Sequence, residues 1–250
     1  MEVINEDFKD EVNGGYFMGP LEAGGVALPT RPKEIYDNSI PSGNSVALRV
    51  LVQLWHRTGD FKYQNAANEL IAAFSSTLTE IPNELGYMVK SASELLNGES
   101  GALRYAGFGK VRTQASITDE NKIQIAIDVA PGWHINSVTP IQEYLIATQL
   151  TDANGKPLEN TNYPDAKLTR LDFEESELSL YDGSIEITAD LPSNFNQSDD
   201  TSSKDDEEAT PSALYTLQLQ LQTCSDEICL APETLTIKVP TVSYADSNSY

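Results

Sequence analysis

Apolar residues recur with two different periods along this chain, a helical one before about residue 98 and a strand-like one after it. Between 45 and 97 they are spaced three and four residues apart, which places them on one face of a helix. This pattern is interrupted at 57–60 and at Pro82, and it ends at Asn97 and Gly98, a helix-stop pair. It predicts a helix from about residue 45, a second over 61–78 with Asp60 as its N-cap, and a third over 83–96.

From about residue 110 onward, apolar and polar residues alternate with a period of two. The clearest example is the segment 122–129, in which Ile123, Ile125, Ile127 and Val129 share one face. Several short strands of this kind with turn residues between them are typical of a β-sandwich. Further strands are expected near 143–151, 166–172, 183–190, 213–223 and 234–240.

Three polar segments divide the chain into regions. A glycine-containing linker over 99–104 separates a helical region, 1–98, from the β-region, 105–242, and a tail follows over 243–250. Within the β-region, the segment 196–212 is rich in Asp, Glu, Ser and Thr and has almost no apolar residue. Such a segment buries too little surface to offset the entropy of ordering it, so we expect a disordered acidic loop. Its carboxylates fit no EF-hand spacing.

The charge of the chain excludes some classes of partner. The 250 residues carry 38 acidic and 16 basic side chains, a formal net charge of −22. Nucleic-acid backbones and anionic membranes would repel such a surface. No run approaches the roughly 18 apolar residues of a membrane helix, so membrane insertion is not expected. The first residues lack the basic and apolar regions of a signal peptide, which in a fragment leaves the location of the parent protein open.

The two cysteines of the chain, Cys224 and Cys229, lie between two alternating strands. A tight connection of this kind brings two sulfur atoms within bonding reach. Closing so short a loop stabilises a fold by only about 2 kcal/mol in the chain-entropy model, which favours a redox pair over a structural bridge. A structural bridge, metal binding and idle thiols stay open as alternatives, although a closed zinc site requires four ligands.

The surroundings of the cysteines oppose thiol chemistry in one respect. Asp226, Glu227 and Glu233 should raise the thiol pKa values by charge repulsion, and no Lys or Arg lies within eight residues of the pair. Strand parity places Cys224 on the face opposite to the leucines of 217–221. We therefore expect Cys224 to point away from the main core, where a partner protein approaches.

The segment that holds the cysteines resembles a known family. Residues 224–234, with Pro232, Glu233 and Thr234 after the second cysteine, are similar to the cysteine loop of the N-terminal domain of the thiol:disulfide interchange protein DsbD. Ala231 departs from the pattern, because relatives often carry a second proline there. Upstream matches follow in the same order, so that the resemblance covers about 105–240: APGWHIN at 130–136, YP at 163–164 and LYDG at 180–183.

This resemblance implies both a fold and a function. The fold would be an immunoglobulin-like β-sandwich, and the whole chain mainly β with an α-helical N-terminal part. The sandwich would pass reducing equivalents between a thioredoxin-like donor and disulfide-bearing proteins of the periplasm, without a bound cofactor. Cys229 would attack the partner's disulfide, and Cys224 would resolve the mixed disulfide.

Residues 1–98 resemble a different family, the YyaL-type thioredoxin-domain-containing proteins. The matching segments imply the C-terminal end of an incomplete α/α-toroid related to six-hairpin glycosidases, and a chain that is a fragment or a truncated product. They are GGYF at 14–17, RPKEIYD at 31–37, IPSGNS at 40–45 and TGD at 58–60.

Thiol:disulfide exchange by the β-region is therefore the favoured hypothesis. The alternative is a non-catalytic β-sandwich with a structural disulfide that stabilises the toroid remnant and binds a protein. We interpret the two histidines without chemistry: His134 as a packing residue at the sandwich edge, since it has no evident carboxylate partner, and His56 as a helix-end residue.

Overall fold

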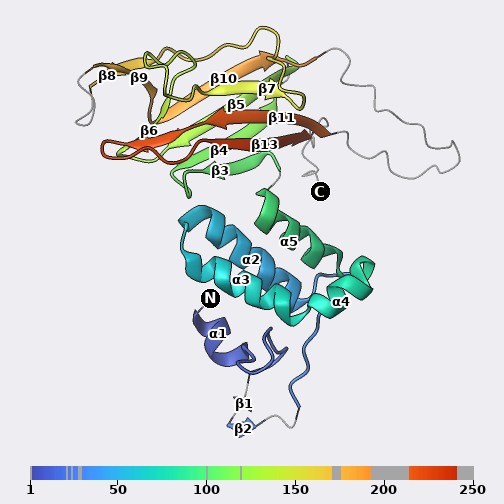
Figure 1. The fold of residues 1–250 in the computed structure, drawn as a ribbon. Helices are drawn as coiled ribbons and strands as arrows, with labels where there is room; N and C mark the ends of the chain where they lie inside the picture. Colours follow the sequence, from blue (N-terminus) through green and yellow to red (C-terminus); the bar gives the residue numbers. More distant parts are fainter. Residues whose placement is uncertain are drawn as a thin grey trace, which may run out of the picture. The chain divides into compact units, whose positions relative to one another are not determined.

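The computed structural model divides the chain into two compact units, Met1–Glu99 and Ser100–Tyr250 (Figure 1). The first is helical and the second is built from antiparallel strands, so the expected fold class is confirmed. The expected acidic loop at 196–212 and the tail at 243–250 lie outside the described residues. The structure describes residues 2–20, 22–23, 25–27, 30–99, 101–118, 120–170, 176–192 and 214–240.

The helical unit is organised around α2. This helix packs against both α3 and α5. No helix in the part of the chain that the structure describes is long and apolar enough to cross a membrane. The elements of the unit are α1 (Glu2–Phe8), the strand pair β1 (Glu22–Ala23) and β2 (Val26–Ala27), α2 (Gly43–Thr58), α3 (Phe61–Ala73), α4 (Ser75–Glu80), the 3-10 turn η1 (Pro82–Leu85) and α5 (Gly86–Asn97).

Capping residues explain where α3 begins and where α2 ends. Asp60 accepts a hydrogen bond from the Lys62 N–H and begins α3, as expected from the sequence. Gly59 ends α2 in the left-handed region, where a residue with a side chain is disfavoured. The predicted helix over 61–78 is divided in the structure, because α3 ends at Ala73 and Phe74 leaves the helical conformation before α4.

A buried asparagine joins α2 to the extended segment before it. The Asn44 side chain accepts from the Tyr16 N–H and donates to the carbonyl oxygens of Tyr16 and Glu34. Buried backbone groups that lose their partners are costly, so this side chain fixes the path of the segment. The core of the unit lies beneath it and is formed mainly by Leu48, Leu51, Val52, Leu70, Leu85 and Met88.

An ion pair ties down the N-terminal segment of the same unit. The Lys33 ammonium lies 2.5 Å from the Asp10 carboxylate, and both side chains are largely buried. Asp10 also accepts from the N–H groups of Val12 and Asn13. The hydrogen bond from Lys33, followed by those from the backbone, holds the pKa of Asp10 well below its usual range.

The helical unit should therefore lose stability in acid, and Asp10→Asn should remove part of this loss. A carboxyl with a depressed folded-state pKa contributes stability above its unfolded pKa of about 3.9, and this contribution disappears as the pH falls towards the folded value. We expect the variant to be less stable at pH 7 and to lose less stability below pH ~4. Thermal unfolding followed by circular dichroism across this range measures the difference. If the wild-type protein and the variant lost the same stability as the pH is lowered, Asp10 would not be the group responsible for the loss in acid.

Among its described residues, the second unit contains three antiparallel sheets. One has the order β10-β5-β4-β3, the next β13-β11-β7, and the third β12-β6-β9-β8. Strands β3 and β4 of the first sheet contact β13 of the second, as in two sheets packed face to face. The strands are β3 (Leu103–Ala106), β4 (Val111–Ile117), β5 (Lys122–Val129), β6 (Trp133–Asn136), β7 (Gln149–Asp152), β8 (Lys167–Thr169), β9 (Leu178–Tyr181), β10 (Ser184–Asp190), β11 (Leu214–Leu221), β12 (Thr223–Ser225) and β13 (Glu233–Pro240).

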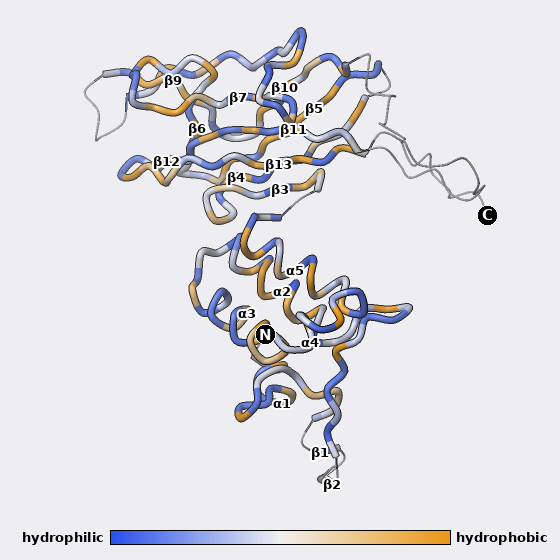
Figure 2. The backbone as a smooth tube through the Cα atoms, turned by 45° about the vertical axis from the view of Figure 1, so that its right-hand side comes forward, coloured by the Kyte–Doolittle hydropathy of each residue, from blue (hydrophilic) through white to orange (hydrophobic). Residues whose placement is uncertain are grey.

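The sandwich core follows the alternation seen in the sequence. Hydrophobic and hydrophilic residues alternate along strands such as β5 and β11 (Figure 2). Each fully buried aliphatic side chain contributes roughly 1.5–3 kcal/mol relative to an exposed one, so this core is the main stabilising element of the unit. Its members include Ile123, Ile125, Ile127 and Val129 of β5, Leu217, Leu219 and Leu221 of β11, and Leu235, Ile237 and Val239 of β13.

Two strands of the sheet that contains β12 are absent from the sequence predictions. β9 is buried at all four positions, so it shows no alternation. β6 has three successive buried residues after Trp133, so it shows no alternation either. The strand expected near 143–151 is largely irregular, because β7 begins only at Gln149.

Candidate functional site

Cys224 and Cys229 form a disulfide across a short hairpin at the end of β12. Their Cα atoms lie 4.0 Å apart, and the two residues face each other as an antiparallel pair. Backbone hydrogen bonds flank the pair on both sides, from the Ser225 N–H to Ile228 and from the Leu230 N–H to Thr223. The hairpin is therefore held by its backbone as well as by the sulfur atoms.

A change of sheet positions this hairpin. β11 ends at Leu221 in the sheet with β13, and after Gln222 the chain continues as β12, which pairs with β6. The Gln222 side chain accepts from the Asn136 amide and from the Ile146 N–H, and it donates to the Leu230 carbonyl. Gln222 thus connects both arms of the hairpin to the end of β6.

The turn between the cysteines is stabilised by a hydroxyl group. The Ser225 Oγ accepts hydrogen bonds from the N–H groups of Glu227 and Ile228. Serine commonly stabilises turns in this way. Asp226, Glu227 and Ile228 are exposed, and Ile228 retains 54% of its accessible surface. The hairpin therefore presents one large apolar side chain between two acidic residues and Cys229.

The two cysteines differ sharply in exposure. Cys229 is exposed, whereas Cys224 retains only 1% of its accessible surface. The expectation that Cys224 lies where a partner approaches is thus wrong. Strand parity failed because the chain leaves its sheet at Gln222, so that the alternation of β11 does not continue into β12. Of the two cysteines, Cys229 is therefore the one that is open to another protein.

His134 lies directly opposite Cys224 on the neighbouring strand β6. It is 5% exposed, and its Nε2 atom is buried without a hydrogen-bond partner in the described structure. Burial lowers the pKa of His134, against smaller opposing effects of the carboxylates of Asp226 and Asp182. An imidazole whose pKa is lowered from about 6.5 is neutral at pH 7. No pattern in the sequence indicates that His134 is a neighbour of Cys224, because the pairing of β6 with β12 is a tertiary feature.

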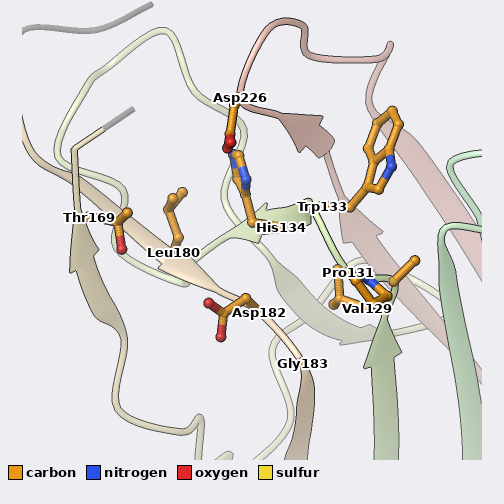
Figure 3. A pocket seen from close by; sticks show the side chains of 11 residues that line it. Val129, Pro131, Trp133, His134, Thr169, Leu180, Asp182, Gly183 and Asp226 are labelled. Carbon is orange, nitrogen blue, oxygen red and sulfur yellow. The ribbon is translucent and has the colours of Figure 1, made fainter. Parts of the chain in front are cut away.

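A pocket of about 330 Å³ opens beside this histidine. The His134 ring is directed towards the Asp226 carboxylate, while Trp133 points to the other side (Figure 3). Asp182 lines the same pocket below the ring, and the segment 129–132 forms another wall. The pocket adjoins the cysteine hairpin through Asp226.

The turn between β3 and β4 supports the cysteine strand from the side. A Cβ atom on Gly107 would lie 2.7–2.9 Å from the side chain of Thr223, the residue before Cys224. The Gly107 N–H donates to the Glu233 carboxylate at 2.6 Å. Glu233, which the sequence suggested as a neighbour that raises the thiol pKa, thus accepts a backbone hydrogen bond.

His56, the other histidine, contacts the Glu94 carbonyl in the helical unit.

Among the residues that the structure describes, no group of three or more His, Cys, Asp or Glu side chains is arranged to hold a metal ion. The hairpin itself offers the chemistry of the two sulfur atoms and of the groups beside them. A buried cysteine, an exposed cysteine and a neutral imidazole follow one another across paired backbone segments. This arrangement suits thiol–disulfide exchange, in which a thiolate attacks one sulfur of a disulfide and displaces the other.

Solved structures and one family model are similar to this chain. Among solved structures, the N-terminal domain of DsbD from Neisseria meningitidis in its reduced form is 10% identical with a TM-score of 0.35, and the match covers 54% of this chain and 87% of that one. The N-terminal periplasmic domain of ScsB from Proteus mirabilis is 16% identical with a TM-score of 0.31, over 50% and 44% of the respective chains. None of the curated proteins matches. The family model for the N-terminal domain of the thiol:disulfide interchange protein DsbD matches residues 109–241, so the chain belongs to this family.

Proposed function

We propose that the sandwich unit passes reducing equivalents from a thioredoxin-like donor to disulfide-bearing proteins through Cys224 and Cys229. The observation that carries this proposal is the unequal exposure of the two bonded cysteine residues, of which Cys229 is exposed and Cys224 is buried. An exposed disulfide sulfur is open to attack by a thiolate from another protein, whereas a buried one is reached only from within the domain. The family match supports the same reaction.

Each cysteine has a distinct role in this cycle. The donor thiolate attacks Cys229, forms a mixed disulfide, and leaves Cys224 as the displaced thiol. The donor's second thiol then releases Cys229 in the reduced form. In the next half-cycle the Cys229 thiolate attacks the acceptor's disulfide, and Cys224 attacks Cys229 to release the reduced acceptor. Electrons enter and leave through Cys229 in both halves.

The surface around Cys229 favours a protein partner. Ile228 is exposed beside it, and an exposed apolar side chain rimmed by the acidic residues Asp226 and Glu227 provides a small docking patch. Such a patch suits a partner that offers an apolar groove with basic or neutral edges. We place the reaction in the periplasm, since disulfides persist in oxidising compartments and the family match leads to the same location.

For the helical unit we propose a scaffold role at the end of an α/α-toroid. Support comes from α2, which buries Leu48 and Leu51 but leaves Val46 and Val50 partly exposed. A helix that is apolar on more than one face normally packs against neighbours on each of them. The competing hypothesis is that the helical unit is carbohydrate-active. Titration calorimetry with oligosaccharides tests it, because a carbohydrate-active unit would bind them with a measurable heat.

The reduction potential of the Cys224–Cys229 pair tests the exchange proposal. We expect equilibration with dithiothreitol or glutathione buffers to give a value near the thioredoxin range of about −270 mV or above, and reduced thioredoxin to open the bond within minutes. A structural disulfide would instead have a potential below about −300 mV and would resist thioredoxin until the sandwich unfolds. That result would support the non-catalytic alternative and overturn the proposal.

A further inference from the structure

Cys229, Cys224 and His134 form a row across adjacent strands. Cys224 pairs with Cys229 on one side and with His134 on the other. Residues directly opposite each other in antiparallel strands direct their side chains to the same face, with Cβ atoms about 4.5–5.5 Å apart. The imidazole is therefore the side chain next to the Cys224 sulfur on the side away from Cys229.

This row persists when the disulfide is opened. The hairpin is held by backbone hydrogen bonds that join Thr223 to Leu230 and Ser225 to Ile228. Gln222 ties the first arm to Asn136 and to Leu230. None of these contacts involves a sulfur atom, so the reduced Cys224 thiol stays beside His134.

A reduced Cys224 meets a chemical obstacle in the exchange cycle. It must lose its proton to attack the mixed disulfide at Cys229, yet burial disfavours a thiolate. With 1% of its surface exposed, the Cys224 side chain has little contact with water that would take the proton. The acidic residues Asp226 and Glu227 in the adjoining turn disfavour a further negative charge. A neutral side chain within the fold that accepts the proton of Cys224 removes this obstacle.

His134 has the properties of such an acceptor. Its Nε2 atom is buried and has no hydrogen-bond partner in the described structure, an arrangement that is costly for a polar atom. Burial disfavours the protonated ring, and the carboxylates of Asp226 in the cysteine turn and Asp182 after β9 oppose this effect, because both stabilise a protonated imidazole. The ring also lines the open pocket, through which a proton can leave for solvent.

We propose that His134 accepts the proton of the Cys224 thiol as Cys224 resolves the mixed disulfide, and returns it when Cys224 is the leaving group. This role rests on the proposed function. In the resolving step the Cys224–Cys229 bond forms and the bond from Cys229 to the partner sulfur breaks. The electron pair leaves on the partner, which is reduced, while the cysteine pair is oxidised. The proton passes from Cys224 to His134 and then to the departing thiolate or to water.

Oxidation of the reduced protein by glutathione disulfide tests this role without the physiological partner. Cys229 first forms a mixed disulfide with glutathione, and Cys224 then displaces reduced glutathione. Acid quenching followed by intact mass spectrometry resolves the reduced, glutathionylated and disulfide forms over time. Since positioned acid–base groups contribute on the order of 100-fold or more to a rate, we expect the mixed disulfide to last at least about ten-fold longer in His134→Gln.

Two further variants separate acid–base chemistry from packing. His56→Gln changes the other histidine, which lies in the helical unit, and should leave the lifetime of the mixed disulfide unchanged. His134→Ala opens space that adjoins the 330 Å³ pocket. Imidazole added to this variant should restore part of the resolving rate and should not accelerate the wild-type protein. A merely structural histidine would show no such rescue.

The outcomes distinguish this inference from the function on which it rests. Equal mixed-disulfide lifetimes in the wild-type protein and in His134→Gln would overturn the role of His134 and leave the exchange function intact. Absence of rescue by imidazole in a slow but folded His134→Ala protein would also overturn it. A wild-type protein that stays reduced under glutathione disulfide would overturn the exchange function and the inference together.

Discussion

A Cys224→Ala variant should accumulate a mixed disulfide through Cys229 when it is mixed with a disulfide-bearing protein, and Cys229→Ala should accumulate almost none. In the first variant the exposed thiol remains and the residue that would release the partner is missing. In the second, the remaining cysteine is Cys224, which retains 1% of its accessible surface in the disulfide-bonded structure and is held on β12 beside β6, so we expect it to stay out of reach of another protein. Because only an accessible thiolate reacts, we expect capture to differ on the order of 100-fold.

The two variants control for each other. Both lack the disulfide, so any loss of stability from the missing bridge is common to them. Capture is measured by acid quenching at a series of times, followed by non-reducing electrophoresis and mass spectrometry. Digestion of the captured complex should place the intermolecular bond at Cys229. Equal capture by Cys224 and Cys229 would show that burial in the folded protein does not assign their roles.

Gly107→Ala should be among the most destabilising single-methyl additions in the sandwich unit. The added Cβ would lie under 3 Å from three atoms of the Thr223 side chain, and Gly107 has a φ of +56°, which disfavours any side chain. The backbone conformation costs about 1–2 kcal/mol and overpacking typically another 1–3 kcal/mol. Together these are a large part of the ~5–15 kcal/mol that stabilises a domain. Relief of the clash requires β12, and with it Cys224, to move.

Gly183→Ala is the matched control for this prediction. Gly183 has a similar φ of +65°, and a Cβ there meets no atom within 4 Å. Its substitution therefore reports the backbone cost alone. Equilibrium urea unfolding, followed by fluorescence in a Trp55→Phe background with Trp133 as the reporter, measures both variants. Similar losses at the two positions would mean that Thr223 moves aside without cost.

The strands that the sequence predicted best are those with one face in the core. The face of Ile123, Ile125 and Ile127 is fully buried in β5 as expected, because alternation reports burial directly. Elements buried on both faces, such as β9, carry no such signal. The helices were predicted from the spacing of their apolar residues, with Asp60 as one N-cap, and the division at Phe74 was missed because no glycine or proline marks it.

For the candidate site, the sequence identified the two sulfur atoms and missed their surroundings. The spacing of Cys224 and Cys229 limits them to a short connection, so their proximity is a local property of the chain. Their accessibility is not local. It depends on the departure of the chain from its sheet at Gln222, which buries one cysteine and leaves the other exposed.

The sequence by itself determined the class of fold and the closeness of the two cysteines, and it indicated a resemblance to an exchange family, because periodicity and short motifs depend on residues close together in the chain. The tertiary structure decided which sulfur meets a partner and which side chain lies beside the buried one. His134 and Cys224 are 90 positions apart in the numbering, and only the pairing of β6 with β12 makes them neighbours. Alternation assigns a residue to a face of its own strand, whereas the choice of neighbouring strand depends on how whole sheets pack.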